Sequence, residues 1–156
     1  MPLKMRRATA EDIPQIWDVR TKAISKGCQT HYSAYNVRKW ADVPPFPGFA
    51  DVIEKTDFYV VEDEGKIVGC GHLDRDKAEI GAMFVDPAVH HRGIASLVLA
   101  HLQEIARQHQ LSVLKLESTL NAEEFYLKAG FHSVERNTFK HPNGFELDCV
   151  LMQKSL

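Results

Sequence analysis

The chain has 156 residues and a formal net charge of -2 at pH 7. This is the length of one ordinary domain, and we expect residues 1–156 to form a single one. Apolar residues make up 44% and charged residues 26% of the sequence, which is typical of a folded soluble protein and excludes a disordered chain. No run of like charge indicates a nucleic-acid or membrane-surface partner. The longest apolar run, Ile80–Val85, is too short to span a bilayer.

The cysteines, Cys28, Cys70 and Cys149, are odd in number and widely spaced. Their spacing matches neither a metal site nor a redox motif. The charged N-terminal residues are followed by no apolar stretch, so no signal peptide is expected. Together these features predict reduced thiols in a cytoplasmic protein that needs no metal.

The first quarter of the chain predicts a strand, two helices and a loop. A short edge strand is expected at Lys4–Ala8, and Thr9–Asp12 has the spacing of a capping box that starts a helix. Apolar residues then recur at helical spacing until Gly27, which ends the helix. A second, shorter helix is predicted at Tyr32–Ala41. The proline-rich stretch Val43–Phe49 predicts a stiff irregular loop.

Three strands and one helix are predicted in the middle of the chain. The strands are Phe58–Glu62, Lys66–Leu73 and Ala78–Val85. The third is a continuous run of small and apolar residues, as expected of a central strand buried on both faces. Ser96–His109 follows as an amphipathic helix with one apolar stripe.

The last part predicts a strand at Val113–Glu117 and a helix that Asn121 caps and Gly130 ends. The strands Phe131–Arg136 and Phe145–Gln153 should follow, joined by a turn. This element order predicts an α/β fold with a mixed, mostly antiparallel sheet of about seven strands and about four helices, lying on both faces.

The loop His90–Ala95 joins the predicted central strand to the long helix. A helix start offers backbone N–H groups without partners, together with a partial positive charge. Gly93 allows a tight turn and close approach of an anion, and Arg92 adds a positive charge suited to phosphate. His90 and His91 are polar and could carry partial charge near neutral pH. On these grounds alone, an anion site and a plain strand-to-helix connection are both open.

The stretch Val85–Ala95 resembles motif A of the GCN5-related N-acetyltransferase (GNAT) superfamily, which is Gln/Arg-x-x-Gly-x-Gly/Ala after a strand ending Val-x-Pro. Gly93 and Ala95 match the small positions, while His90 stands where the family usually has Gln or Arg. Asn121–Phe131 resembles the family segment in which an Asn starts a helix and a Phe-Tyr pair precedes Gly-Phe. Two motifs in the right order are far more specific than one. The resemblance implies a GNAT-like fold over the whole chain.

The resemblance also implies an activity, the direct transfer of an acetyl group from acetyl-CoA to a primary amine within a ternary complex. It places the acetyl-CoA contacts at ten positions: Phe84, Val85, His90, His91, Arg92, Gly93, Ile94, Ala95, Ser96 and Asn121. The alternative is an acyl-CoA-binding sensor without turnover. A homodimer is left open.

Attack by an amine needs proton transfers, because an alkyl ammonium has a pKa of about 10.4. Tyr126 matches the family's tyrosine that protonates the departing sulfur; otherwise it is a core tyrosine. Glu79 matches a glutamate that acts as general base in some members, although a strand-edge acid facing solvent is the plainer interpretation. His72 and ordered water are the competing bases. A covalent route through Cys70 or Cys149 is disfavoured, because neither lies beside a helix start or obvious cations.

The acceptor is the least determined part. Five aromatic residues gather near the first two helices, namely Tyr32, Tyr35, Trp40, Phe46 and Phe49. They could wall a small-molecule pocket or anchor a loop on the core. Small-molecule, glycan, lysine and peptide-terminal amines all stay open as acceptors.

Overall fold

The structure is a computed structural model that describes residues 2–156. The strands are β1 (Lys4–Arg7), β2 (Asp57–Asp63), β3 (Lys66–Asp74), β4 (Glu79–Val85), β5 (Val113–Thr119), β6 (His132–His141) and β7 (Phe145–Ser155). The α-helices are α1 (Ile13–Gly27), α2 (Ala34–Ala41), α3 (Phe49–Lys55), α4 (Ile94–Gln108) and α5 (Glu123–Lys128). Short 3-10 helices are η1 (Ala10–Asp12), η2 (Pro87–Arg92) and η3 (Leu120–Ala122).

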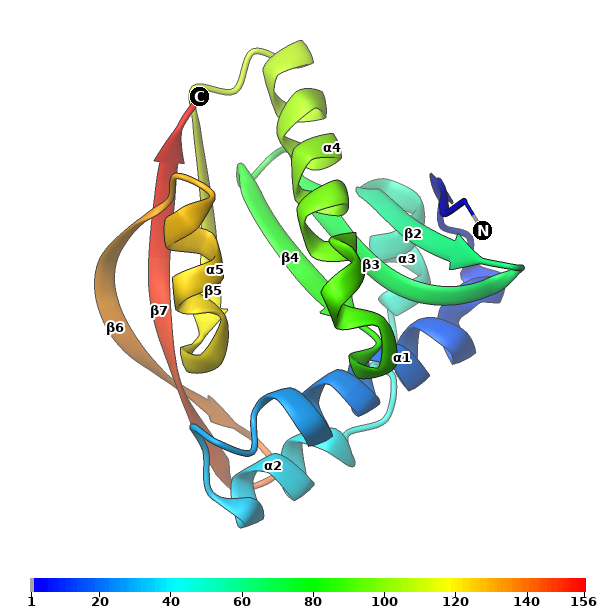
Figure 1. The fold of residues 1–156 in the computed structure, drawn as a ribbon. Helices are drawn as coiled ribbons and strands as arrows, with labels where there is room; N and C mark the ends of the chain where they lie inside the picture. Colours follow the sequence, from blue (N-terminus) through cyan, green and yellow to red (C-terminus); the bar gives the residue numbers. More distant parts are fainter. Residues whose placement is uncertain (1) are drawn as a thin grey trace.

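All seven strands join one sheet in the order β1-β2-β3-β4-β5-β7-β6. Neighbouring strands are antiparallel except β4 and β5, which are parallel. The predicted mixed, mostly antiparallel sheet with helices on both faces is therefore confirmed (Figure 1). The capping box is also present, with the Thr9 N–H donating to Asp12 Oδ2 at 2.8 Å.

Helix α3 is an element that the sequence did not predict. It begins after Gly48, whose φ of 98° turns the chain out of the proline-rich loop. Phe49 and Ile53 are its buried residues, and they pack against β2. Two turns with two buried positions are too short to establish a helical period, so hydrophobic patterning could not reveal this helix.

Two hydrophobic cores cover the two faces of the sheet. Helices α4 and α5 pack with residues of β3, β4, β5 and β7 on one face, and α1 and α3 pack with β2 and β3 on the other. Helix α4 approaches β3 closely at Gly69, where an added Cβ would meet Ile94 Cγ2 at 2.5 Å. The absence of a side chain at this position therefore sets the start of α4 against the sheet.

Strands β4 and β5 diverge after a brief contact. Within residues 2–156 they share one register pair, Glu79 with Lys115, beside a hydrogen bond from the Lys115 N–H to Ala78 O of 2.9 Å. Further along, β4 carries an irregularity at Ala82, whose φ is 50°, opposite a register shift in β3. Such bulges bend a strand and end pairing. In Figure 1 the two strands open into a V, and β5 continues instead with β7.

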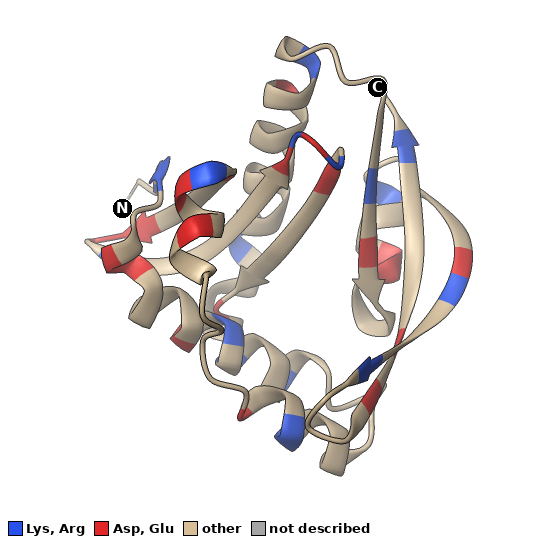
Figure 2. Cartoon of the chain, turned by 180° about the vertical axis from the view of Figure 1, so that it is seen from behind, with Lys and Arg blue, Asp and Glu red and all other residues tan. Residues whose placement is uncertain are grey.

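The β6–β7 hairpin forms the outer edge of the sheet and curves beside α2. Strand β6 reaches His141, five residues beyond its predicted end at Arg136, because its largely exposed residues show no alternation that could mark a boundary. Charged residues lie on helices, strands and turns alike (Figure 2). Strand β4 carries one, Glu79 at its start, whereas β5 carries Lys115 and Glu117. No helix within residues 2–156 has the length and hydropathy to cross a membrane.

Candidate functional site

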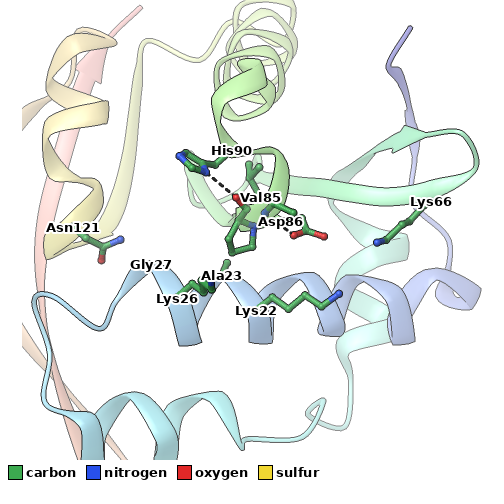
Figure 3. A pocket seen from close by; sticks show the side chains of 11 residues that line it. Lys22, Ala23, Lys26, Gly27, Lys66, Val85, Asp86, His90 and Asn121 are labelled. Atoms are coloured by element: carbon green, nitrogen blue, oxygen red, sulfur yellow. Dashed lines mark hydrogen bonds between the residues drawn. The ribbon is translucent and has the colours of Figure 1, made fainter. Parts of the chain in front are cut away.

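A cavity of about 750 Å³ lies between α1 and the C-terminal end of β4. Its lining comprises Lys22, Ala23, Lys26, Gly27, Lys66, Val85, Asp86, Pro87, Ala88, His90 and Asn121. Figure 3 shows these side chains around one space, with α1 below it and the start of α4 above. Amino groups from two separate elements, α1 and β3, therefore border a single cavity.

A second cavity of about 240 Å³ fills the gap between β4 and β5. Its lining comprises Ala23, Ile24, Cys28, Trp40, Ile80, Gly81, Ala82, Met83, Phe84, Val85, Leu116, Glu117, Ser118, Thr119, Asn121, Ala122 and Tyr126. The two cavities share Ala23, Val85 and Asn121, so they adjoin. We call them the outer and inner cavities.

The predicted phosphate loop has a different local structure from a simple turn. After β4 the chain forms η2, and Gly93, with a φ of 75°, then starts α4. The first helical hydrogen bond runs from the Leu97 N–H to Gly93 O at 3.0 Å. The amides of Ile94, Ala95 and Ser96 therefore lack intrahelical partners, as at any helix start. This gives the loop the donors that an anion requires.

The side chains of the loop serve different purposes. His90 lines the outer cavity, and its Nδ1 lies 2.7 Å from Pro87 O. His91 packs edge-on against His90 and lines neither cavity. Arg92, predicted as a phosphate partner, forms a 2.6 Å ion pair with Asp63 on β2. The positive charge of Arg92 is thus partly neutralised by the Asp63 carboxylate, which makes Arg92 a weaker partner for a phosphate than the sequence suggested.

Lysines supply the positive charge at the outer cavity, which the sequence interpretation missed. Lys22 and Lys26 lie one turn apart on α1, and Lys66 begins β3. Lys22 is also 2.9 Å from Asp18 on the same helix. Helical spacing could have placed Lys22 and Lys26 on one face, but it could not show that this face meets the end of β4.

Tyr126 lies where α5 meets the inner cavity. It is 7% exposed, and its ring packs edge-on against Phe125 and Phe131. Burial raises the pKa of its hydroxyl above the ordinary value of 10. The group therefore keeps its proton at neutral pH.

Asn121 was predicted to cap this helix, and that prediction is wrong. Ala122 is the N-cap residue of α5 and no side chain caps the helix, while Asn121 itself lies inside η3. The 3-10 turn displaced the start of the helix, a detail that residue preferences do not resolve. Asn121 instead lines both cavities at their junction, where a bound molecule passing between them would meet its amide.

Glu117 is a site residue that the sequence interpretation did not single out. It lies on β5 and, among the described residues, is the carboxylate that lines the inner cavity. Its Oε2 is 4.0 Å from the thiol of Cys149 on β7. Along β5, Leu114 and Leu116 are buried and Glu117 is exposed, as expected of side chains that alternate between the two faces of a strand. This alternation alone does not show that the sheet opens beside Glu117.

Glu79 and His72, the two candidate bases from the sequence, line neither cavity. Glu79 is half-buried at the first residue of β4, in the pairing with Lys115. His72 pairs with Gly81 and stacks on Phe58 with ring centroids 5.2 Å apart. The structure therefore brings Tyr126 together with Glu117, rather than with either of these residues.

The buried thiols are poorly suited to form thiolates. Burial raises the pKa of Cys28, which lines the inner cavity, to about 11, and that of Cys70 to about 12. The pKa of Cys149 is raised by burial and by the nearby carboxylate of Glu117. Since the thiolate is the reactive form, none of these cysteines is activated as a nucleophile.

A sheet that opens between two parallel strands, beside a glycine-led helix start, agrees with the acyl-CoA-dependent acetyltransferase class that the motifs implied. A family model described as an acetyltransferase (GNAT) domain matches residues 28–155. The chain belongs to this family.

Similar proteins agree with this assignment. The chain is 33% identical over 142 residues to the amino-acid acetyltransferase of Mycobacterium tuberculosis, covering 84% of this chain and 69% of that protein. A GCN5-related N-acetyltransferase from Rhodopseudomonas palustris has the same fold, with a TM-score of 0.88, 21% identity, and coverage of 100% and 97% of the two chains. PaiA N-acetyltransferase from Thermoplasma acidophilum, solved in complex with coenzyme A, has a TM-score of 0.78 at 14% identity, with both chains fully covered.

His72 yields a prediction about stability. Burial lowers its pKa from the ordinary value of 6.5, and its Nδ1 has no partner among the described residues. Below pH 6.5, His72 is protonated in the unfolded chain but stays neutral in the folded protein. The unfolded state therefore binds more protons, and the free energy of unfolding falls as the pH falls. His72→Phe keeps a ring against Phe58 and removes the titration. Urea unfolding measured at pH 7.5 and at pH 5.5 should show that the free energy of unfolding decreases less in the variant than in the wild-type protein. An equal decrease in both proteins would contradict this role of His72.

Proposed function

We propose that the protein transfers the acetyl group of acetyl-CoA directly to a primary amine within a ternary complex. The observation that supports the proposal is the inner cavity between β4 and β5, because both Tyr126 and Glu117 are among the residues that line it. A proton donor and a proton acceptor are the two groups that amide formation requires. The proposal takes residues 1–156 as a single catalytic domain in the cytoplasm.

The outer cavity suits the diphosphate end of the donor. Gly93, Ile94, Ala95 and Ser96 are not among the residues that line this cavity, but they begin α4, which starts above it (Figure 3). The free amides of Ile94, Ala95 and Ser96 would bind one side of the diphosphate from there, and Gly93 would let it approach. The backbone groups of His91 and Arg92 would form the preceding part of this diphosphate-binding loop. The amino groups of Lys22, Lys26 and Lys66 would add positive charge from the other side of the cavity.

The pantetheine arm would run through the junction into the gap. There β4 lacks a strand partner on one edge. The Asp86 N–H donates to Val68 O on β3, so along this part of β4 the backbone groups of Phe84 turn to β3 and those of Val85 turn to the open edge. Val85 is therefore the residue whose backbone groups are available to the amides of the arm, while Phe84 would contact it through its side chain. Asn121 would hydrogen-bond the arm from the opposite side. The thioester would then lie in the inner cavity, near Tyr126.

Reaction would follow from these positions. The base first takes one proton from the ammonium group and passes it to solvent. The neutral nitrogen then attacks the thioester carbonyl and forms the C–N bond, and the base takes the second proton that the nitrogen loses. The C–S bond then breaks, and Tyr126 gives its proton to the departing sulfur. Backbone N–H groups near the end of β4 would stabilise the negative oxygen of the intermediate. A cysteine intermediate is not part of the proposal, because burial raises the pKa of all three thiols.

Glu117 is our first choice for the base, because it lines the cavity that Tyr126 lines. Glu79, which the family resemblance suggested, would need a chain of water molecules to reach the amine from the start of β4. His72 would need the same, and burial against Phe58 lowers its pKa. The three candidates can be separated by replacing Glu117, Glu79 and His72 in turn with an uncharged residue and measuring how turnover depends on pH. The residue whose replacement alters the pH–rate profile is the base.

Tyr126→Phe tests the role of the acid. Without the phenolic proton, kcat should fall by roughly a hundredfold or more, while the Kd for acetyl-CoA should change by less than about twofold. Turnover can be followed as release of the CoA thiol, and binding by calorimetry. Tyr35→Phe, at an exposed residue of α2, is the matched control and should leave both unchanged. Unchanged turnover in Tyr126→Phe would show that Tyr126 is not the acid. Tight acetyl-CoA binding by the wild-type protein, with no turnover for any amine, would favour the sensor alternative.

Lys26→Gln tests the donor site. Loss of one positive charge should weaken acetyl-CoA binding by about three- to tenfold at low salt, and less at high salt, because the contact is electrostatic. The same variant should use acetyl-pantetheine, which lacks the diphosphate, as well as the wild-type protein does. Lys55→Gln on α3, which borders neither cavity, is the control. Equal acetyl-CoA affinity in both variants would contradict this site.

A further inference from the structure

We infer that the acceptor is a small primary amine on an apolar or aromatic stem that carries no carboxylate, and that Glu117 binds its ammonium group. This inference rests on the proposed function and names the substrate class of the same site. It follows from three features of the inner cavity: its walls, its charge and the way its far wall is fixed.

The walls beyond the thioester position are apolar. Ile24 and Cys28 come from the end of α1, Trp40 comes from α2 and Phe84 from β4. Of the aromatic residues near the first two helices, Phe49 is instead buried in the core, and Tyr35 and Phe46 are exposed. Trp40 is thus the member of that group that meets the inner cavity. A cavity of about 240 Å³ with such walls accommodates a short aliphatic chain or one aromatic ring.

The charge of this region is negative. Glu117 lies in the lining. Asp148, the residue before Cys149 on β7, is exposed and lines neither cavity, and its Oδ1 accepts a 3.0 Å hydrogen bond from Thr138 Oγ1. Both carboxylates contribute to the raised pKa of Cys149, and Asp148 contributes to that of Tyr32. An ammonium group is stabilised by this field. The carboxylate of an amino acid, one carbon from the amine, would be brought next to Glu117 and repelled.

The far wall is fixed from two sides. The carbonyl of Trp40 accepts a 2.7 Å hydrogen bond from Arg20 Nη2, and the Trp40 ring packs edge-on against Tyr32. The Tyr32 hydroxyl donates to Asp148 O and accepts a 3.0 Å hydrogen bond from the Leu120 N–H. Tyr32 therefore links the segment between α1 and α2 to both β7 and η3. A wall tied in this way favours a small molecule over an extended peptide.

The experiment compares acceptors that share a stem and differ only in the group beside the amine. The full chain with acetyl-CoA is assayed for thiol release with tyramine, tyrosinamide and tyrosine. The same comparison uses tryptamine with tryptophan, and butylamine with norvaline. We expect kcat/KM for each amine to exceed that for its amino acid by at least about a hundredfold, with tyrosinamide close to tyramine. Asp148→Asn, outside the catalytic groups, should narrow the difference between tyramine and tyrosine.

The outcomes separate the inference from the proposed function. Amino acids acetylated as well as their amines, or peptides preferred over both, would overturn the inference and leave acetyl transfer standing. Tight acetyl-CoA binding with no thiol release for any acceptor would overturn the proposed function and the inference with it. A preference for amines that Asp148→Asn leaves unchanged would overturn the electrostatic explanation.

Discussion

The parting of β4 from β5 is the constraint on which the rest of the molecule depends. A buried strand normally satisfies its backbone groups on both sides, and an unpaired polar group in the interior is costly. Here β4 pairs with β3 along most of its length but meets β5 at Glu79 alone among the described residues. The open edge keeps backbone donors and acceptors available at the centre of the fold. The inner cavity occupies that opening, and it is here that we propose the pantetheine arm takes the place of a neighbouring strand.

Other elements hold the opening in shape. The close approach of α4 to Gly69 fixes the helix start at the mouth of the outer cavity. On the other side, Lys154 Nζ of β7 donates to Ala129 O at the end of α5, at 2.7 Å, and to Gln103 Oε1 of α4, at 2.9 Å. This contact ties α5 to α4 and β7. Tyr126, which lines the gap, therefore belongs to a helix that is anchored at its end, three residues further along at Ala129.

Much of this arrangement could be predicted from the sequence, because local rules specify it. Hydrophobic alternation and helical spacing predicted the strands and the long helices. The helix predicted at Ser96–His109 corresponds to α4, which begins two residues earlier, at Ile94, directly after Gly93. The short helix α3 and the 3-10 turn that contains Asn121 were missed, because two turns or fewer carry too little pattern. Glu117 and the lysines of the outer cavity were missed for a different reason. Their roles depend on which strands separate and which helix faces the opening, and these are tertiary facts.

The same distinction applies to the catalytic groups. Tyr126 was chosen from a motif, and the structure places it on the inner cavity. Glu79 was chosen from its distance to the loop, yet the divergence of β4 from β5 puts the cavity beyond it along the strand. Sequence distance along a strand says nothing about where its partner leaves it. The acceptor side depends still more on tertiary contacts, since its walls come from α1, α2, β4 and β5 together.

The most direct test of the central claim is the set of backbone amides that respond when a non-hydrolysable acetyl-CoA analogue is added to the isotope-labelled protein. Nuclear magnetic resonance should show large shift changes for Val85 on the open edge of β4 and for Ile94–Ser96 at the start of α4. The amides of the β6–β7 hairpin tip should change little. Saturable binding with changes confined to the hairpin, or absent from β4, would contradict the account that the opening between β4 and β5 holds the donor.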